Sequence, residues 1–235
     1  MESTISHKKI YMPLPEHRDG LDGEINLVSG ATPPRIPLIR LTLEEQEAFE
    51  KYLAHMIRLG YIEPSKSPYG SPIFFVKSDG KPPRPVVDYR KLNDITIKDV
   101  FPLPLIEELL TCLAKANYHT KFDLKQAFNL LRIRSGDEPL TAFRCHLGTF
   151  QYRVMPFGLS NSPSHFQRFI TSIFSDMLLK VMIVYVDDLV IFGGKTLEEH
   201  QLIVLEVLRR IDDENLGINI GKSLFHEKKI DRFCR

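Results

Sequence analysis

No charge of one sign dominates this chain of 235 residues. Lysine and arginine together number 31 and aspartate and glutamate number 30, so the formal net charge at pH 7 is +1. Dedicated DNA-binding modules usually carry a clear basic excess, which this composition lacks. Any basic surface that the chain uses to hold a nucleic acid must therefore be local.

Cysteines and long apolar runs are also scarce. The three cysteines (Cys112, Cys145 and Cys234) lie far apart, without the spacing of a disulfide framework or a zinc site. The longest apolar run, residues 181–186, is far too short to cross a bilayer. The first twenty residues contain no apolar core of a signal peptide. We therefore expect a soluble, intracellular protein that is neither secreted nor attached to a membrane.

The order of elements along the chain favours the α+β class. Prolines and glycines without a hydrophobic period mark residues 1–43 as an extended lead-in. A capping box at Thr42 and Glu45 then opens a helix. Further helices are expected around 102–116, 163–179 and 196–216, and residues 125–134 look helical before the chain extends. Strands and helices mix without regular alternation, which argues against a doubly wound sheet.

A basic β-hairpin is predicted between the first two helices. Residues 73–76 and 86–89 read as strands, and Ser78-Asp79-Gly80 reads as the turn between them. Residues 77–91, around the tip, contain two aspartates and five basic residues. The basic residues are Lys77, Lys81, Arg84, Arg90 and Lys91. Taken alone, Arg84 would be a solvated charge of the hairpin.

Three carboxylates carry the most chemical information. Asp187 and Asp188 are adjacent between two short apolar strands, and Asp123 ends another apolar strand. Adjacent aspartates are costly to bury, so an exposed hairpin turn and a metal site both fit this stretch. Asp123 favours the metal site, because oxygen ligands from two elements suit Mg²⁺.

The motifs together resemble those of a known family. Tyr185-Val186-Asp187-Asp188 resembles the tyrosine-X-aspartate-aspartate signature of reverse transcriptases. The resemblance extends through SPYGSPIFFVKSDGKPPRPVVDYRKLN, FPLPLIEELL, FDLKQAFNLLRI and TAFRCHLGTFQYRVMPFGLSNSPSHFQRF. Order and spacing are similar to gypsy-type LTR retrotransposons, and LPEHRDGLDGEINL resembles their stretch between protease and polymerase. One departure is Ser162, where the group usually has alanine.

The resemblance implies roles for particular residues. Asp123, Asp187 and Asp188 would be catalytic metal ligands, with Leu124 binding metal only through its backbone carbonyl. Two Mg²⁺ ions, or Mn²⁺, would be the cofactor. Lys77 and Arg84 would contact the triphosphate of the incoming deoxynucleotide.

Three further residues would bind that nucleotide. Phe128 would be a steric gate against the ribose 2′-hydroxyl, although an ordinary core aromatic is the other reading of this position. Phe157 and Gly158 belong to the loop MPFGL, which would pack against nucleotide and template. Retroviral members usually have glutamine in place of Phe157, so no polar contact is expected from it.

The implied protein is the fingers and palm of an RNA-directed DNA polymerase. Fingers are expected at 44–98 and 131–160, and a palm with an antiparallel sheet and packed helices at 99–130 and 161–235. The chain ends where the family's thumb begins, so a thumb is not expected in it. The implied partners are an RNA or DNA template with its primer, deoxynucleoside triphosphates, and the rest of a polyprotein with thumb, RNase H and integrase.

Two other functions stay open. An inactive or truncated retrotransposon remnant would have the same motifs without polymerase activity. A different metal-dependent phosphoryl-transfer enzyme would share the aspartates, but would leave the Lys77–Arg84 hairpin and Phe128 as coincidences.

Overall fold

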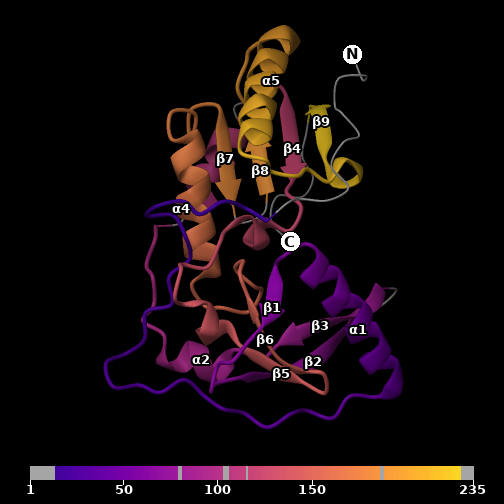
Figure 1. Ribbon diagram of the computed structural model, residues 1–235. Helices are drawn as coiled ribbons and strands as arrows, with labels where there is room; N and C mark the ends of the chain where they lie inside the picture. The colour runs from indigo at the N-terminus through magenta and orange to yellow at the C-terminus, as the bar shows by residue number, and fades with distance from the viewer. Residues whose placement is uncertain (1–13, 79–80, 103–105, 115, 186–187, 229–235) are drawn as a thin grey trace. The chain divides into compact units, whose positions relative to one another are not determined.

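Two compact units make up the protein. The computed structural model describes residues 14–78, 81–102, 106–114, 116–185 and 188–228. The five-stranded unit comprises the described parts of 13–99 and 128–162, and the four-stranded unit those of 100–127 and 163–235 (Figure 1). Each unit has its own sheet and its own buried core.

The five-stranded unit has a mixed sheet in the order β1-β6-β5-β2-β3. The β2–β5 pair is parallel and the other pairs are antiparallel. Its elements are α1 (Leu43–Arg58), β1 (Ile62–Pro64), β2 (Ser71–Ser78), β3 (Lys81–Val87), α2 (Arg90–Ile95), η1 (Ala127–Leu130), η2 (Glu138–Thr141), β5 (Phe143–Cys145) and β6 (Gly148–Tyr152).

Helix α1 begins and ends where local chemistry requires. The Thr42 hydroxyl accepts from the Glu45 backbone N–H, and the Glu45 carboxylate accepts from the Thr42 N–H, which completes the predicted capping box. Gly60 follows the helix with φ +75°, a conformation that costs glycine little. Phe49 on the buried face meets Phe143 of β5 edge-to-face, with ring centroids 6.3 Å apart.

Strand β3 is rich in proline because it lies at the edge of the sheet. Pro82, Pro83 and Pro85 cannot donate ladder hydrogen bonds, and an edge strand needs them on one side only. The register shifts between Val76 and Ser78, where β3 has one more residue than β2. The extra residue is a β-bulge beside Pro82 and Pro83, a usual place for prolines in a sheet.

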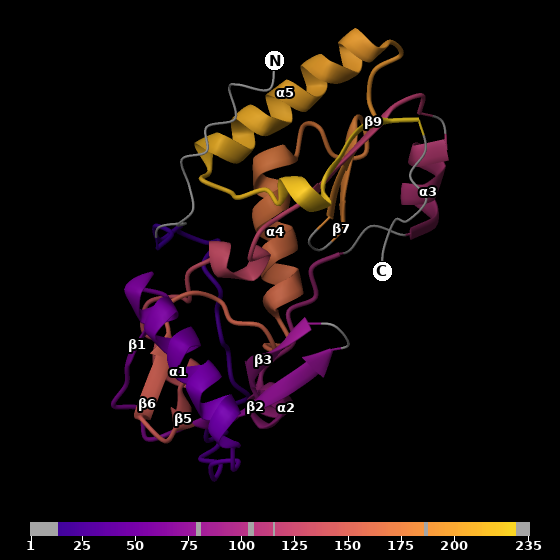
Figure 2. The ribbon, with the colours of Figure 1, turned by 90° about the vertical axis from the view of Figure 1, so that its right-hand side faces the viewer.

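The four-stranded unit has an antiparallel sheet in the order β7-β8-β4-β9. Helices α4 and α5 lie on one face of this sheet and α3 lies on the other (Figure 2). Its elements are α3 (Ile106–Ala114), β4 (His119–Asp123), α4 (Ser162–Phe174), β7 (Met182–Tyr185), β8 (Asp188–Ile191), α5 (Leu197–Asp213), η3 (Ile220–Lys222) and β9 (Leu224–Glu227).

Strand alternation divides the core of this sheet between the two sets of helices. Ile183 and Val190 face α3, where they pack with Cys112, Leu113 and Ala116. On the opposite face, the Thr120 hydroxyl is 2.9 Å from Nε2 of His200 on α5. The sheet is thus covered on both faces along much of its length. In the described ranges no helix is both long and apolar enough to cross a membrane.

The expected helix over 125–134 is wrong. Only the short 3₁₀ turn Ala127–Leu130 forms there. Gln126 has φ +50°, which interrupts a right-handed helix, and the Lys125 N–H donates to the Gly217 carbonyl instead of continuing one. Long-range pairing therefore overrides local propensity. The expected hairpin turn at Asp79-Gly80 lies outside the described residues.

Arg210 of α5 ties this helix to the end of α4. Its Nη1 donates to the Ile173 carbonyl at 3.0 Å, and both Nη atoms donate to Asp176 at 2.6 and 2.8 Å. Its Nε donates to Glu206. Hydrogen bonds from Arg210 lower the pKa of Asp176 to about 2. The guanidinium thus donates hydrogen bonds both to the Ile173 carbonyl near the end of α4 and to the Asp176 carboxylate beyond that helix.

We predict that Arg210→Met lowers the melting temperature by about 2–4 °C at pH 7, because the carbonyl and carboxylate lose their shared donor. A carboxylate with a depressed pKa stabilises the folded state above its ordinary value of 3.8, and that contribution is lost as the pH falls through about 2. The gap between wild type and variant should therefore narrow between pH 4 and pH 2. Thermal unfolding across this range measures it.

Arg209→Met is the matched control. Arg209 is more exposed than Arg210 and pairs with Glu206 and Asp213 along its own helix. Exposed pairs of this kind contribute little, so its melting temperature should fall by less than about 1 °C. Equal losses in the two variants would contradict the role given to Arg210.

Candidate active site

Two aspartates face each other at one end of the four-stranded sheet. Asp123 ends β4, Asp188 begins β8, and the antiparallel ladder pairs them directly. Side chains paired in this way have Cβ atoms about 4.5–5.5 Å apart, where like charges repel. The Asp123 and Asp188 side chains are 27% and 21% exposed. The fold therefore brings these two predicted site residues together and leaves both partly exposed to solvent.

The third predicted carboxylate, Asp187, lies outside the described residues. Within the described ranges, no three His, Cys, Asp or Glu side chains form a group that could hold a metal. Asp123 and Asp188 still supply carboxylate oxygens from two adjacent strands, and such hard donors suit a divalent cation such as Mg²⁺. The described part of the site thus fits this class of ion through two of its three expected carboxylates.

Two lysines lie beside the carboxylate pair. Lys121 Nζ is 2.6 Å from Asp188 Oδ2, and this lysine side chain is only 16% exposed. Lys222 Nζ is 3.9 Å from Asp123 Oδ2, with 68% of its side chain exposed. Short, partly buried charge pairs interact more strongly than exposed ones. Lys121 is therefore the main neutralising charge among the described neighbours.

The backbone after Asp123 is held by the chain before η3. The Asn219 N–H donates to the Asp123 carbonyl and the Lys125 N–H donates to the Gly217 carbonyl, both at 2.8 Å. These bonds flank the bridge between Leu124 and Ile218. Neither of them uses the Leu124 carbonyl, the atom that the resemblance assigns to a metal.

Lys77 and Arg84 project from the hairpin of the five-stranded unit. Arg84 pairs with Val76 across the ladder, and Lys77 follows Val76 at the bulge. Both side chains are exposed, and among the residues that the structure describes neither has an ion-pair partner. Arg90 differs, because its fork of hydrogen bonds to Asp88 lowers the pKa of that carboxyl. The hairpin therefore presents Lys77 and Arg84 as cations open to an anion.

Phe128 and Phe157 pack on one another. Their ring centroids are 4.9 Å apart at 69°, an edge-to-face contact. Phe128 is 7% exposed, whereas Phe157 is 53% exposed. Phe128 is thus a core aromatic with a small open edge, and both readings of it remain compatible with its position. Most of the exposed aromatic surface here belongs to Phe157.

The loop that contains Gly158 is fixed against α2. Gly158 has φ +99°, and a Cβ there would lie 3.4 Å from the Val87 carbonyl oxygen, so a larger residue would strain the turn. The side-chain amide of Asn93 holds the loop through both its nitrogen and its oxygen. Its Nδ2 donates to the Gly158 carbonyl at 2.7 Å, and its Oδ1 accepts from the Ser160 N–H at 2.8 Å.

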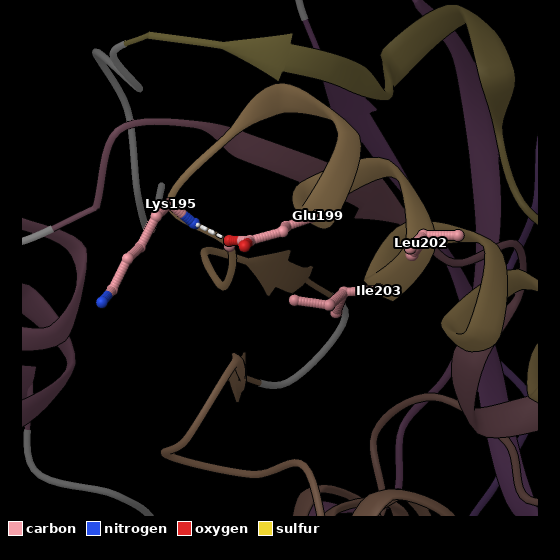
Figure 3. Close-up of a pocket in the computed structure, with 5 residues that line it drawn as sticks. Lys195, Glu199, Leu202 and Ile203 are labelled. Carbon is pink, nitrogen blue, oxygen red and sulfur yellow. Dashed lines mark hydrogen bonds between the residues drawn. The ribbon is translucent and has the colours of Figure 1, made fainter.

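A hollow of ≈ 550 Å³ lies elsewhere, where the chain enters α5 (Figure 3). Its lining is Gly194, Lys195, Glu199, Leu202 and Ile203. Glu199 accepts from the Lys195 N–H at 2.7 Å, and this contact belongs to the start of the helix. Among the predicted site residues that the structure describes, none is part of this lining, and the hollow is therefore separate from the paired aspartates.

Sequence reasoning missed two residues of this arrangement. Lys121 precedes Asp123 by two positions, and strand alternation places such residues on one face, so a signal was present. Asn93 is 65 residues from Gly158. No local pattern could reveal that contact.

Comparison with known proteins identifies the family. Residues 76–232 match the family model described as "Reverse transcriptase (RNA-dependent DNA polymerase)". The Tf2-3 and Tf2-4 transposon polyproteins of Schizosaccharomyces pombe are each 36% identical to this chain over 219 residues. Those matches cover 92% of this chain and 16% of each polyprotein. The chain thus spans about one-sixth of the length of these relatives.

Solved structures share the fold. A foamy viral protease-reverse transcriptase in complex with an RNA/DNA hybrid matches with a TM-score of 0.77 at 22% identity, over 89% of this chain and 28% of that one. A related structure in complex with double-stranded DNA matches with a TM-score of 0.72 at 21% identity, over 89% of this chain and 36% of that one. These likenesses confirm the predicted α+β fingers-and-palm class. The family prediction is confirmed too, and this chain belongs to the reverse transcriptase family.

Proposed function

We propose that this chain contains the reacting centre of an RNA-directed DNA polymerase. It would add deoxynucleotides to a primer 3′-hydroxyl opposite an RNA or DNA template. Family membership supports the reaction type. The observation that carries the proposal is the direct pairing of Asp123 with Asp188 at the open end of a buried sheet. An exposed turn alone does not require a second carboxylate opposite it.

A divalent metal is the cofactor that this family implies. We assign two Mg²⁺ ions, with Mn²⁺ as a substitute, to Asp123, Asp187, Asp188 and the Leu124 carbonyl. When bound, such ions supply the charge that activates an attacking hydroxyl and stabilises a leaving pyrophosphate. The carboxylates act as ligands and do not transfer protons. The chain's own contribution is to hold their oxygens in place before the ions arrive.

The five-stranded unit would bind the incoming nucleotide. Lys77 and Arg84 supply open positive charge for its triphosphate, and an arginine can bind phosphate oxygens through two parallel hydrogen bonds. Phe128 would exclude a ribose 2′-hydroxyl. The exposed ring of Phe157 and the backbone at Gly158 would pack against the nucleotide and its template base.

The domain assignment is part of the same proposal. Residues 44–98 and 131–160 would be fingers, 99–130 and 161–235 palm, and 1–43 the lead-in from the preceding part of a polyprotein. The relatives in complex with an RNA/DNA hybrid and with double-stranded DNA support a primed template as partner. The polyprotein relatives support the rest of such a polyprotein as a second one.

We predict that Asp123→Asn lowers primer extension by at least about a hundredfold, because a metal ligand loses its charge. Asp187→Asn and Asp188→Asn should behave alike. The measurement is incorporation of dTTP on poly(rA)/oligo(dT) with Mg²⁺ or Mn²⁺, with folding checked by circular dichroism.

Asp213→Asn is the control for this series, since its carboxylate is exposed and forms an ion pair with Arg209 on α5. It should retain full incorporation. If Asp123→Asn retains it too, the assigned centre is wrong. If the wild-type chain incorporates nothing with either metal, the polymerase proposal fails for this chain and the remnant reading replaces it.

We predict that Arg84→Ala raises the KM for dTTP about tenfold with a smaller effect on kcat, because a charge-assisted phosphate contact is lost. Lys91→Ala is the control, as another exposed basic residue close to the hairpin. Its KM should change less than about twofold. A tenfold rise in both variants would indicate a general effect of charge on template binding.

We predict that Phe128→Val lowers the preference for dTTP over UTP by about 10- to 100-fold, since a smaller side chain makes room for the 2′-hydroxyl. Phe157→Val is the control, because it removes the ring that contacts Phe128 and leaves Phe128 itself in place. It distinguishes an effect of the Phe128 side chain from an effect of the contact between the two rings. Steady-state kinetics with both nucleotides give the ratio. An unchanged ratio in Phe128→Val would leave Phe128 as a core aromatic only.

A further inference from the structure

Lys121 occupies an unusual position for a lysine. Strand β4 lies between β8 and β9, so Lys121 has strands on both sides, with Val190 and Leu224 as its partners. Lysine is depleted in strands and is rarely buried unless it is paired. Its side chain is nevertheless only 16% exposed. A specific partner must therefore offset the cost of this position.

That partner is Asp188. Because Asp188 stands opposite Asp123, it is the diagonal neighbour of Lys121 on the same face of the sheet. The ammonium donates to Asp188 Oδ2 at 2.6 Å. Both groups are about four-fifths buried or more, so solvent screens their attraction less than that of an exposed pair. Lys222, by contrast, is mostly exposed and 3.9 Å from Asp123.

The pair has a consequence for the metal-free site. Asp123 and Asp188 repel each other across the ladder, and the Lys121 charge offsets part of this repulsion. An ion that binds both carboxylates must share Asp188 with this ammonium. A fixed positive charge beside a cation site lowers the affinity of that site.

We propose that Lys121 is a positioning residue that holds Asp188 in the metal-free site and competes with the divalent cation for it. The proposal rests on the metal site given under the proposed function. Lys121 then stabilises the sheet when no metal is bound. It also makes the affinity of the site for a divalent cation weaker than the carboxylates alone would give. Its removal should therefore tighten metal binding while destabilising the metal-free chain.

Mn²⁺ affinity is the first test, measured on the full chain by the paramagnetic resonance signal of free Mn²⁺. We expect Lys121→Met to bind Mn²⁺ about tenfold more tightly than wild type, because the competing charge is gone. Lys121→Arg should stay within about threefold of wild type, since it restores the charge. Lys222→Met removes an equal but exposed charge and should change the affinity less than about twofold. Unchanged or weaker binding by Lys121→Met overturns the proposal.

Thermal unfolding in EDTA is the second test. Lys121→Met should lower the melting temperature in wild type and lower it much less in an Asp188→Asn background, because the repulsion has then been removed. Equal losses in the two backgrounds would show that Lys121 acts by packing and not through Asp188. Lys121→Gln serves the same two tests if Lys121→Met does not fold.

The two levels of proposal fail differently. If wild type and Lys121→Met both fail to bind Mn²⁺, the metal site itself is wrong, and this inference is overturned with it. If wild type binds Mn²⁺, Asp188→Asn abolishes binding and Lys121→Met matches wild type, then only the role of Lys121 is refuted. Tighter binding in Lys121→Met than in wild type and Lys222→Met supports both.

Discussion

Repulsion between two carboxylates is the constraint around which the four-stranded unit is arranged. Asp123 and Asp188 lie directly opposite each other in an antiparallel ladder whose other residues, apart from Lys121, are fully buried. Away from this end the sheet is covered, by α5 on one face and by α3 on the other. The carboxylates lie where solvent still reaches the sheet, so their charges can be hydrated, paired with lysine or bound to a cation.

Rigidity around these carboxylates follows from the same arrangement. Asp123 ends a strand paired on both sides, and its carbonyl is held by the Asn219 N–H. Asp188 begins a strand paired with both β4 and β7. A site that depends on charge positioning gains most when its ligands are fixed before the ions bind. In the proposed reacting centre, the pairing of strands would therefore serve catalysis as well as stability.

The helix starts and the two paired aspartates could be predicted from the sequence, because the patterns that mark them are local. The capping box at Thr42 and Glu45 marked a helix start that the structure confirms. Aspartates at the ends of apolar strands pointed to Asp123 and Asp188, since alternation and strand ends are visible in one sequence. The contact of Phe128 with Phe157 and the link from Asn93 to Gly158 were not predictable, because they join residues that only the fold brings together. The helix expected over 125–134 failed for the same reason, as long-range pairing of Lys125 displaced it.

The basic side chains near the two candidate binding sites differ between the two units: those of the hairpin are exposed, and the one beside the aspartates is paired. In the hairpin, Asp88 is bound to Arg90, while Arg84 and Lys77 remain exposed on and beside an edge strand. The prolines of β3 leave few donors along that edge, which also limits its pairing with another chain. At the paired aspartates, the nearest lysine is instead drawn into the sheet and bound to Asp188. An exposed, unpaired lysine or arginine can bind a phosphate without first breaking a contact within the protein. Lys121, in contrast, must share Asp188 with any metal ion that binds there. Under the proposed function, the exposed hairpin cations would therefore bind an anion readily, whereas Lys121 would weaken the binding of a cation by the aspartate pair.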